Sequence, residues 1–412
     1  MAGPRAIASR FTRRIAGTFD PLLRPRYTEG NRIRLLATPP EFFARLAQGI
    51  AQAQRTVHLE TYIFTSGHAG SELRAALEQA ARRGVEVRVL VDGFGTGESA
   101  HALRAALSAA GGQLRVYRPE RAWRARASVL RRLHRKMAVI DDRIAFVGGI
   151  NIEDPPTRDE FTGEAIGMRM DMAVECEGPL VAAVSNAVRR LWWAVGVADW
   201  REYTRRAPRR VRPENPRSEG VRAALVLRDN LRHRHSIEHR YRAAIRDARE
   251  EILMACAYFL PGRRLRNALT RAARRGVRVR LLLQGRVEYR LQHAAQRALY
   301  GQLLAAGIQI HEYRLSYLHA KVAVIDRHWA TVGSSNIDPI SLLLAREANV
   351  VVRDAAFSRS LQGAIESAMA EGATVLDPKD YARRTLRQRL QDLVALWIVR
   401  TMTVVLARRQ DY

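Results

Sequence analysis

Two short stretches of the chain repeat one arrangement of histidine, lysine and aspartate. They are LHRKMAVID at residues 133–141 and LHAKVAVID at residues 318–326, and both fit the pattern H-x-K-x4-D. The pattern selects six candidate catalytic side chains: His134, Lys136, Asp141, His319, Lys321 and Asp326. The chain is rich in arginine and has three lysines, of which two stand at the same motif position, so chance repetition is a poor explanation.

The spacing places the histidine and the lysine of each motif on one side of a β-strand, because residues two apart share a face. A neutral imidazole nitrogen can attack the phosphorus of a phosphate ester, while a fixed ammonium group stabilises the charge on the phosphoryl oxygens. A second imidazole can protonate the leaving alcohol and then deprotonate the incoming one. The aspartate falls where the strand enters a turn, so we expect it to orient groups or fix the turn rather than react.

Further candidates follow each motif. The stretches GGIN (148–151) and GSSN (333–336) are rich in small residues, which let the backbone approach a phosphate. We expect four residues here to bind the phosphate: Gly149, Asn151, Ser334 and Asn336. On matching strands downstream, Asp171 and Glu347 are each expected to accept a hydrogen bond from the histidine of their own half. Neither half has an obvious carboxylate cluster for Mg²⁺, so we expect no metal and no other cofactor.

The elements that must position these side chains occur twice in one order. RTVHLETYIF (55–64) is a predicted buried strand, and a helix at 71–84 and another strand follow; the second half repeats this order from EEILMACAYF (250–259). This succession predicts two tandem α/β domains, each with a mainly parallel or mixed sheet flanked by helices. The predicted segments are a basic arm (1–30), domain 1 (31–204), a linker (205–217), domain 2 (218–380) and a C-terminal amphipathic, membrane-associating helix (381–412).

The composition restricts the partners. Basic residues exceed acidic ones by 28 and the pI is about 11.3, which favours polyanions such as nucleic acid or anionic lipid headgroups. The hydrophobic share of 47% is that of a globular chain, and 412 residues are enough for two cores. Cys176 and Cys256 are too few for a disulfide framework or a metal site, and we expect both in the core.

Three segments allow two interpretations each. The N-terminal arm lacks the apolar run of a signal peptide and is predicted to be disordered or to contact a membrane. An arginine-rich insert at 118–132 either contacts an anionic surface or is a solvated loop. The apolar stretch at 393–407 is interrupted by Arg400 and is shorter than the roughly 18–20 residues of a membrane span, so it either lies in a headgroup layer or docks on the protein's own core.

The paired motifs resemble those of the phospholipase D superfamily over about residues 31–380. Stretches such as LETYIF, LHRKMAVIDDRIAFVGGIN and DMAVECEGP are most similar to bacterial cardiolipin synthases of the shorter type, which lack N-terminal membrane helices. The resemblance implies two domains related by a pseudo-twofold axis, one shared active site and a covalent phosphohistidine intermediate formed without a metal. Gly149 replaces the serine more usual after the first motif, so the two half-sites need not be equivalent.

For the function, the resemblance implies transfer of a phosphatidyl group to the glycerol hydroxyl of phosphatidylglycerol, with release of glycerol or another alcohol. By analogy His134 is the nucleophile and His319 the acid and base, and the pseudo-symmetry leaves the reverse open. The implied partners are anionic phospholipids, with phosphatidylethanolamine as a candidate donor, and the cytoplasmic face of a bacterial inner membrane. A hydrolytic phospholipase D and a nuclease of the superfamily are the rival functions, and the sequence leaves the oligomeric state open.

Overall fold

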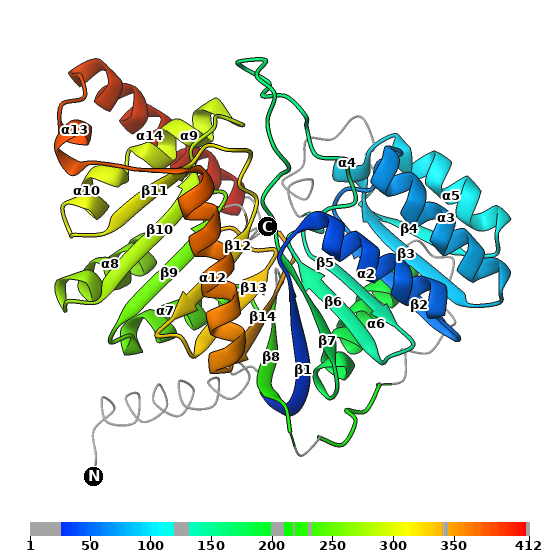
Figure 1. The fold of residues 1–412 in the computed structure, drawn as a ribbon. Coiled ribbons are helices and arrows are strands. Elements are labelled where there is room, and N and C mark those ends of the chain that lie inside the picture. The colour runs from blue at the N-terminus through cyan, green and yellow to red at the C-terminus, as the bar shows by residue number, and fades with distance from the viewer. Residues whose placement is uncertain are drawn as a thin grey trace, which may run out of the picture.

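Two α/β halves lie side by side in the computed structural model, which describes residues 26–118, 132–198, 210–216, 219–229, 233–339, 341 and 345–408 (Figure 1). Most of the N-terminal arm and of the arginine-rich insert lies outside these residues. The described strands form one sheet of 15 strands in the order β15-β11-β10-β9-β12-β13-β14-β8-β1-β7-β6-β5-β2-β3-β4. The predicted α/β fold with two domain segments and flanking helices is confirmed.

The first half combines parallel and antiparallel strands. Its strands are β1 (Thr28–Leu36), β2 (Thr56–Thr61), β3 (Glu86–Asp92), β4 (Gln113–Tyr117), β5 (Lys136–Ile140), β6 (Ile144–Gly148) and β7 (Ala173–Glu177). Its helices are α2 (Pro39–Gln52), α3 (His68–Arg82), α4 (Gly93–Thr96), α5 (Ser99–Ala109) and α6 (Leu180–Ala198). Strands β2, β3 and β4 are parallel, whereas β5, β6 and β7 are antiparallel to their neighbours.

The second half repeats this plan. Its strands are β8 (Val221–Arg228), β9 (Glu251–Cys256), β10 (Arg278–Gln284), β11 (Gln309–Tyr313), β12 (Lys321–Ile325), β13 (Trp329–Gly333), β14 (Glu347–Arg353) and β15 (Ala373–Val375). Its helices are α7 (Ser236–Asp247), α8 (Arg263–Arg274), α9 (Arg290–Arg297), α10 (Tyr300–Leu304), α12 (Ala355–Gly372), α13 (Pro378–Ala382) and α14 (Leu386–Arg408). Strands β9, β10 and β11 are parallel, and β12, β13 and β14 are antiparallel to their neighbours.

Local sequence explains where these helices begin. In α2 the side chain of Thr38 accepts a hydrogen bond from the Glu41 amide, and Pro39 occupies the first turn, where its missing N–H costs nothing. The buried Phe42, Leu46 and Ile50 recur at a spacing of four, so one face of α2 packs on the sheet. Helix α12 starts in the same manner, because the side chain of Asp354 caps the amide of Phe357.

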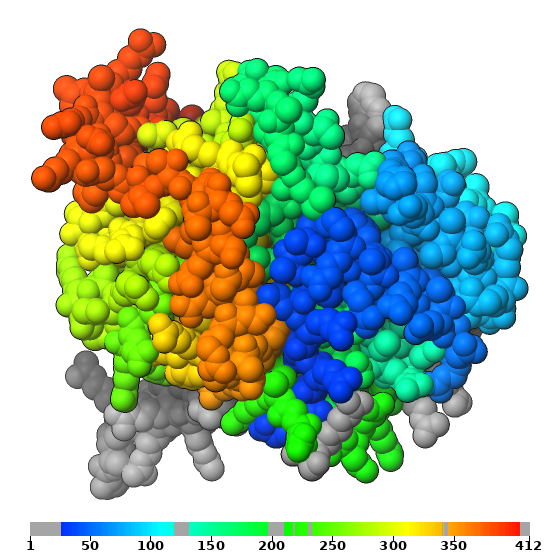
Figure 2. Space-filling model, viewed as in Figure 1, coloured from blue at the N-terminus to red at the C-terminus, as the bar shows by residue number. Residues whose placement is uncertain are grey.

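The two halves share a core at their join. Strand β1 pairs with β7 of its own half and with β8 of the other, which makes the sheet continuous. One apolar cluster includes side chains from both sides, among them Val174 and Val350. Helix α6 contacts β8 and α12 contacts β1, so each of these helices also touches the opposite half. Figure 2 shows α12 (orange) beside the N-terminal segments of the first half (blue) on this face. This shared core holds the two halves in one arrangement.

The C-terminal segment forms a helix that is docked along one side. Helix α14 packs against α9, and Ala395 and Leu396 join the buried cluster that contains Leu299. None of the described helices is both long and apolar enough to cross a bilayer. Cys176 and Cys256 are free and buried, as expected.

Candidate active site

The motif histidines come to the edge of the sheet where its parallel strands end. Strand β5 runs antiparallel to β2, and β12 runs antiparallel to β9. The residues just before β5 and β12 therefore lie at the C-terminal ends of β2 and β9. Open α/β sheets bind ligands at this edge, in the crevice formed by the loops that follow the carboxyl ends of the strands. His134 and His319 each precede their strand by two residues, which places both at this edge.

Each motif histidine is hydrogen-bonded to a carboxylate of the opposite half. The His134 Nδ1 atom lies 2.9 Å from Glu347 Oε1, and the His319 Nδ1 atom lies 2.6 Å from Asp171 Oδ2. The expectation that each carboxylate serves the histidine of its own half was wrong. A carboxylate accepts, so each imidazole donates through Nδ1–H and keeps the lone pair of Nε2 for chemistry. Neither half alone holds an oriented histidine.

Backbone pairing across the join causes this exchange. The amide of His134 donates to the carbonyl of Arg346 at 3.0 Å, and the amide of His319 donates to the carbonyl of Met170 at 2.7 Å. Leu133 and Arg346 form a short parallel bridge, and the equivalent bridge joins Met170 and Leu318. Each histidine thus pairs with the residue that precedes the opposite carboxylate. This backbone pairing across the join therefore places the carboxylate beside the imidazole.

The motif lysines are buried beside the histidines. Lys136 Nζ donates to the carbonyl of His134 at 2.8 Å, and Lys321 Nζ donates to the carbonyl of His319 and lies 3.9 Å from Asp171 Oδ2. Burial, and next the charge of Lys321, lowers the pKa of Lys136 to about 7. Burial also lowers the pKa of Lys321, although Asp171 opposes this. Because the charge of Lys321 disfavours the charged form of Lys136, a bound anion would stabilise both ammonium groups.

Burial favours the uncharged form of both motif imidazoles. Burial lowers the pKa of His134, and Glu347 opposes the shift. Burial, followed by Lys321, lowers the pKa of His319 well below its ordinary value. The Asp171 carboxyl has its pKa raised to about 6 by burial, with Lys321 acting in the opposite direction. A neutral imidazole with a free Nε2 is the form needed for nucleophilic attack or for taking up a proton, whereas an imidazole that protonates a leaving alcohol must carry a proton on Nε2.

Asp141 and Asp326 do not lie with the histidines, although the motif makes them candidate catalytic residues. Each directly follows the last residue of its strand and has a positive φ, 53° for Asp141 and 49° for Asp326. Asp141 accepts hydrogen bonds from three consecutive amides of residues 54–56, at 2.7 to 2.9 Å. Asp326 does the same for residues 249–251 at 2.8 to 2.9 Å. These contacts agree with the expected turn-fixing role, since they tie the motif strand to the start of β2 or β9.

The residues expected to bind phosphate divide into two kinds. The Ser334 hydroxyl donates to Glu347 and accepts from the Ala348 amide at 3.1 Å, so its one proton serves Glu347 rather than a phosphate. Gly149 occupies the matching place beside Asp171, where an added Cβ would lie 2.3 Å from Asp171 Oδ1. Asn151 and Asn336 are buried, and each has a side-chain oxygen without a partner among the described residues.

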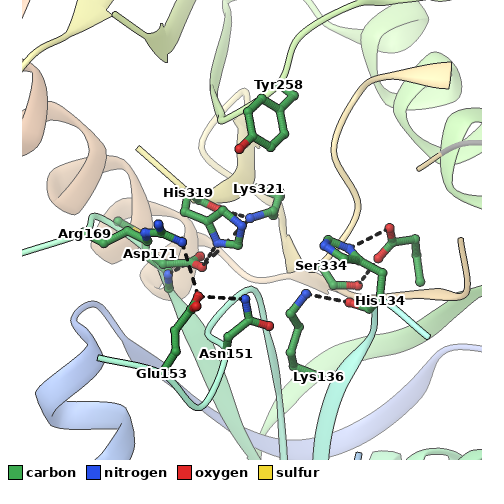
Figure 3. Close-up of polar contacts among 12 residues, drawn as sticks. His134, Lys136, Asn151, Glu153, Arg169, Asp171, Tyr258, His319, Lys321 and Ser334 are labelled. Carbon is green, nitrogen blue, oxygen red and sulfur yellow. Dashed lines mark hydrogen bonds and ion pairs between the residues drawn. The ribbon is translucent and has the colours of Figure 1, made fainter. Parts of the chain in front are cut away.

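Sequence reasoning missed several side chains around the motif residues, of which Figure 3 labels Glu153, Arg169 and Tyr258. The ring of Tyr62 lies 5.1 Å from that of His134, between centroids. Arg169 forms ion pairs with Glu153 at 3.3 Å and with Glu288 at 3.2 Å. The Tyr258 hydroxyl donates to Glu288. Two of these have a signal in the sequence, because Glu153 stands two residues after Asn151 and Arg169 two before Asp171. The others come from loops whose distant positions only the fold brings together.

Comparisons with known proteins show which family this chain belongs to. Residues 46–192 and 241–369 match the family model described as "Cardiolipin synthase, PLD-like domain". The chain is 38% identical over 385 residues to cardiolipin synthase B of Salmonella typhi, and 37% identical to that of Escherichia coli K12. Each alignment covers 91% of this chain and 89% of the relative. Cardiolipin synthase A of Pseudomonas aeruginosa is 30% identical over 88% of this chain and 71% of the relative.

Solved structures support the fold. A phosphatidylserine synthase from Haemophilus influenzae superposes with a TM-score of 0.68 at 11% identity, covering 94% of this chain and 98% of that one. A polyphosphate kinase from Porphyromonas gingivalis superposes with a TM-score of 0.54 at 15% identity over 85% of this chain and 49% of that one. At these identities the likeness concerns the architecture alone. Within the described residues, no group of three histidine, cysteine or carboxylate side chains is arranged to hold a metal ion.

Proposed function

Since the chain belongs to the cardiolipin synthases of the phospholipase D superfamily, we propose that it transfers a phosphatidyl group to the glycerol hydroxyl of phosphatidylglycerol. The observation that carries this proposal is the pair of imidazoles, each oriented through Nδ1 by a carboxylate of the other half. Two such imidazoles with two buried ammonium groups meet the needs of a two-step displacement at a phosphodiester.

In the first step, Nε2 of His134 attacks phosphorus, and the bond from phosphorus to the headgroup oxygen breaks. The leaving oxygen takes a proton from Nε2 of His319, whose protonated form Asp171 stabilises through Nδ1. Lys136 and Lys321 stabilise the charge on the non-bridging oxygens. The products are a free alcohol and a phosphatidyl group bonded to His134.

In the second step, the now neutral Nε2 of His319 removes the proton of the acceptor hydroxyl. The acceptor oxygen attacks phosphorus, the bond to His134 breaks, and His319 is left protonated for the next cycle. The hydroxyl of Ser334 keeps Glu347 in place beside His134 through both steps. The acceptor decides the product, because water gives phosphatidic acid and phosphatidylglycerol gives cardiolipin.

Purified protein incubated with labelled phosphatidylglycerol vesicles tests this function. We expect cardiolipin and free glycerol, with the same yield when EDTA is present. Addition of phosphatidylethanolamine tests it as a donor, through release of ethanolamine. Phosphatidic acid as the sole product would show a hydrolase, and cleavage of single-stranded DNA without lipid turnover would show a nuclease. Loss of the activity in EDTA would contradict the metal-free mechanism.

We further propose that α14 binds the protein to an anionic membrane surface, on the cytoplasmic face of the inner membrane. Its apolar side chains follow a spacing of four, three and four and lie opposite the docked face: Leu386, Leu390, Leu393 and Trp397, which are 54 to 82% exposed. Arg387, Arg389 and Arg400 are exposed on both flanks of this stripe. Such an arrangement suits a helix lying in the headgroup layer.

Vesicle sedimentation tests the role of α14. We expect Leu390→Ser combined with Trp397→Ser to weaken binding to phosphatidylglycerol vesicles at least tenfold. Val375→Ser is the matched control, because Val375 is 60% exposed but lies on β15. Turnover of a short-chain, water-soluble lipid should stay within twofold in both variants. Unchanged vesicle binding by the double variant would contradict the proposal.

A further inference from the structure

One side of the site carries a polar cluster that the two-step displacement does not use. Glu153 Oε1 accepts from Asn151 Nδ2 at 3.0 Å and lies 3.3 Å from Arg169 Nη1. Arg169 Nη2 lies 3.2 Å from Glu288 Oε1, whose second oxygen accepts from Tyr258. Glu153 and Arg169 come from the loop between β6 and β7, and Glu288 and Tyr258 follow β10 and β9. Both halves therefore build this cluster.

The cluster adjoins the reacting groups on the side of His319. Figure 3 shows Arg169 beside Asp171 and His319, with Asn151 between Glu153 and Lys136. The charges act on the same groups. Burial, then Lys321 and then Arg169, lowers the pKa of His319, whereas Glu153 is among the carboxylates that oppose the lowered pKa of Lys136. His319 handles the proton of both alcohols in the proposed reaction, so an alcohol lies on this side.

Two buried polar atoms in the cluster have no partner among the described residues. They are Oδ1 of Asn151, a residue that is 6% exposed, and Nε of Arg169. A buried amide oxygen without a donor is destabilising, so Oδ1 of Asn151 calls for a ligand that donates a hydrogen bond. The carboxylates of Glu153 and Glu288 also accept hydrogen bonds. The cluster therefore offers several acceptors and one donor, Nε of Arg169, to an incoming group, and a hydroxyl can both donate and accept.

We infer that Glu153, Asn151 and Glu288, held together by Arg169, bind the hydroxyl groups of the acceptor's glycerol headgroup. Hydroxyls are donors that carry no charge, and they match a cluster whose carboxylates are already paired with a guanidinium. A phosphate would be repelled by the two carboxylates, and an ammonium headgroup would meet Arg169 and the two motif lysines. The cluster thus selects a polyol for the second step. This inference rests on the proposed function.

Among the described residues, the loop that follows the second motif shows no equivalent of this cluster. Asp338 holds the place of Glu153 two residues after the motif asparagine, but its side chain accepts from the amide of Ser341 at 3.0 Å and is 3% exposed. This contact lies within its own loop. The two half-sites therefore differ in the group that they present to an alcohol, and the polyol side coincides with the acid–base histidine.

Competition between two acceptors tests the subsite. The protein is given phosphatidylglycerol vesicles as donor and acceptor, with 1-propanol as a rival acceptor that has one hydroxyl. Cardiolipin and phosphatidylpropanol share the first step, so their ratio reports the second step alone. We expect Glu153→Gln to lower this ratio about tenfold or more, because 1-propanol has a single hydroxyl and depends less on the cluster than glycerol does. Glu288→Gln should act in the same direction.

The matched control is Glu164→Gln, because Glu164 lies on the same loop but pairs with Arg286 and is 64% exposed. Its product ratio should equal that of the wild type. An unchanged ratio in both test variants would overturn the subsite and leave the proposed function standing. Equal loss of both products would also overturn it, because the cluster would then serve the reacting centre itself. A wild type that makes no cardiolipin would overturn the function and the subsite together.

Discussion

The carboxylate that orients His134 is itself held by a hydroxyl, whereas the carboxylate that orients His319 has no hydroxyl partner among the described residues. Ser334 donates to Glu347, and Gly149 stands at the matching place beside Asp171. Asp171 instead has Lys321 at 3.9 Å and accepts from its neighbouring amide at 2.8 Å. The motif is the same in both halves, and its supporting contacts differ. Two such surroundings can give two equal histidines different tasks.

A second difference lies at the middle residue of the motif. Arg135 is 4% exposed and binds Glu60 through two hydrogen bonds, at 2.5 and 2.9 Å. The equivalent residues of the second half are Ala320 and, by strand register, Ala255. The side chain of this middle residue points away from the histidine and the lysine. The reactive pair therefore tolerates either a buried ion pair on that side, as in the first half, or two alanines, as in the second. The two halves thus share the histidine and the lysine of the motif but differ at the residue between them.

The largest expected effect separates the two histidines. Either His134→Asn or His319→Asn should lower turnover by at least about 10³-fold, because each histidine has a part in both steps. Labelled lipid should accumulate as a phosphohistidine on the His319→Asn protein and not on the His134→Asn protein, as detected after rapid denaturation. The reverse pattern would exchange the two roles.

The lysines should resist replacement by arginine. Lys136→Arg should lose about 100-fold in turnover, and Lys321→Arg at least as much, because a planar guanidinium does not fit where a compact ammonium is 1 to 4% exposed. Circular dichroism and thermal melting should show that the fold survives. An active Lys136→Arg protein would refute this account.

Placing in the first half the serine that the second half has at the matching position should lower turnover. Gly149→Ser should lower turnover roughly tenfold to 100-fold, since its Cβ would lie 2.3 Å from Asp171 Oδ1 and would push that carboxylate away from His319. Ser334→Ala removes a hydrogen bond and should cost roughly tenfold or less. Steady-state rates on the same vesicles give both values. Wild-type turnover by Gly149→Ser would contradict this prediction, because it would show that a serine is tolerated beside either carboxylate.

The pH dependence of kcat/KM should reflect two side chains of the first half, Asp171 and Lys136. The Asp171 carboxyl, with its pKa raised to about 6, becomes protonated below that pH and no longer holds His319, so kcat/KM should fall about tenfold per unit on the acid side. Lys136, with its pKa lowered to about 7, loses its charge above that pH, so kcat/KM should fall there too. Profiles on a short-chain, water-soluble lipid give both limbs, and a flat profile from pH 5 to 8 would contradict them.

The smallest effect on activity, and a clear one on stability, is expected behind the first motif. Glu60→Gln should destabilise the fold by about 3 kcal/mol, because it leaves Arg135 buried without its charge partner. Combining Glu60→Leu with Arg135→Met, which imitates the apolar second half, should return to within about 1 kcal/mol of the wild type. Denaturant unfolding measures both, and losses that add in the double variant would show that the pair is not coupled.

Most of the site residues, but not their partners, could be predicted from the sequence. His134, Lys136, His319 and Lys321 stand out because a repeated motif and the alternation of a strand are local properties. The role of Ser334 could not be predicted, since a serine near a phosphate site and a serine that supports a carboxylate look the same in a sequence. Arg169 and Glu288 are 119 residues apart and meet only through the fold.

The sequence by itself determined the duplicated α/β plan, the motif side chains that share a strand face and the turn aspartates. All of these follow from short-range periodicity and spacing. The tertiary structure decided which carboxylate orients which histidine, because that depends on the bridges between Leu133 and Arg346 and between Met170 and Leu318 across the join. A sequence records the order of strands along each half. The exchange of carboxylates arises from the packing of one half on the other.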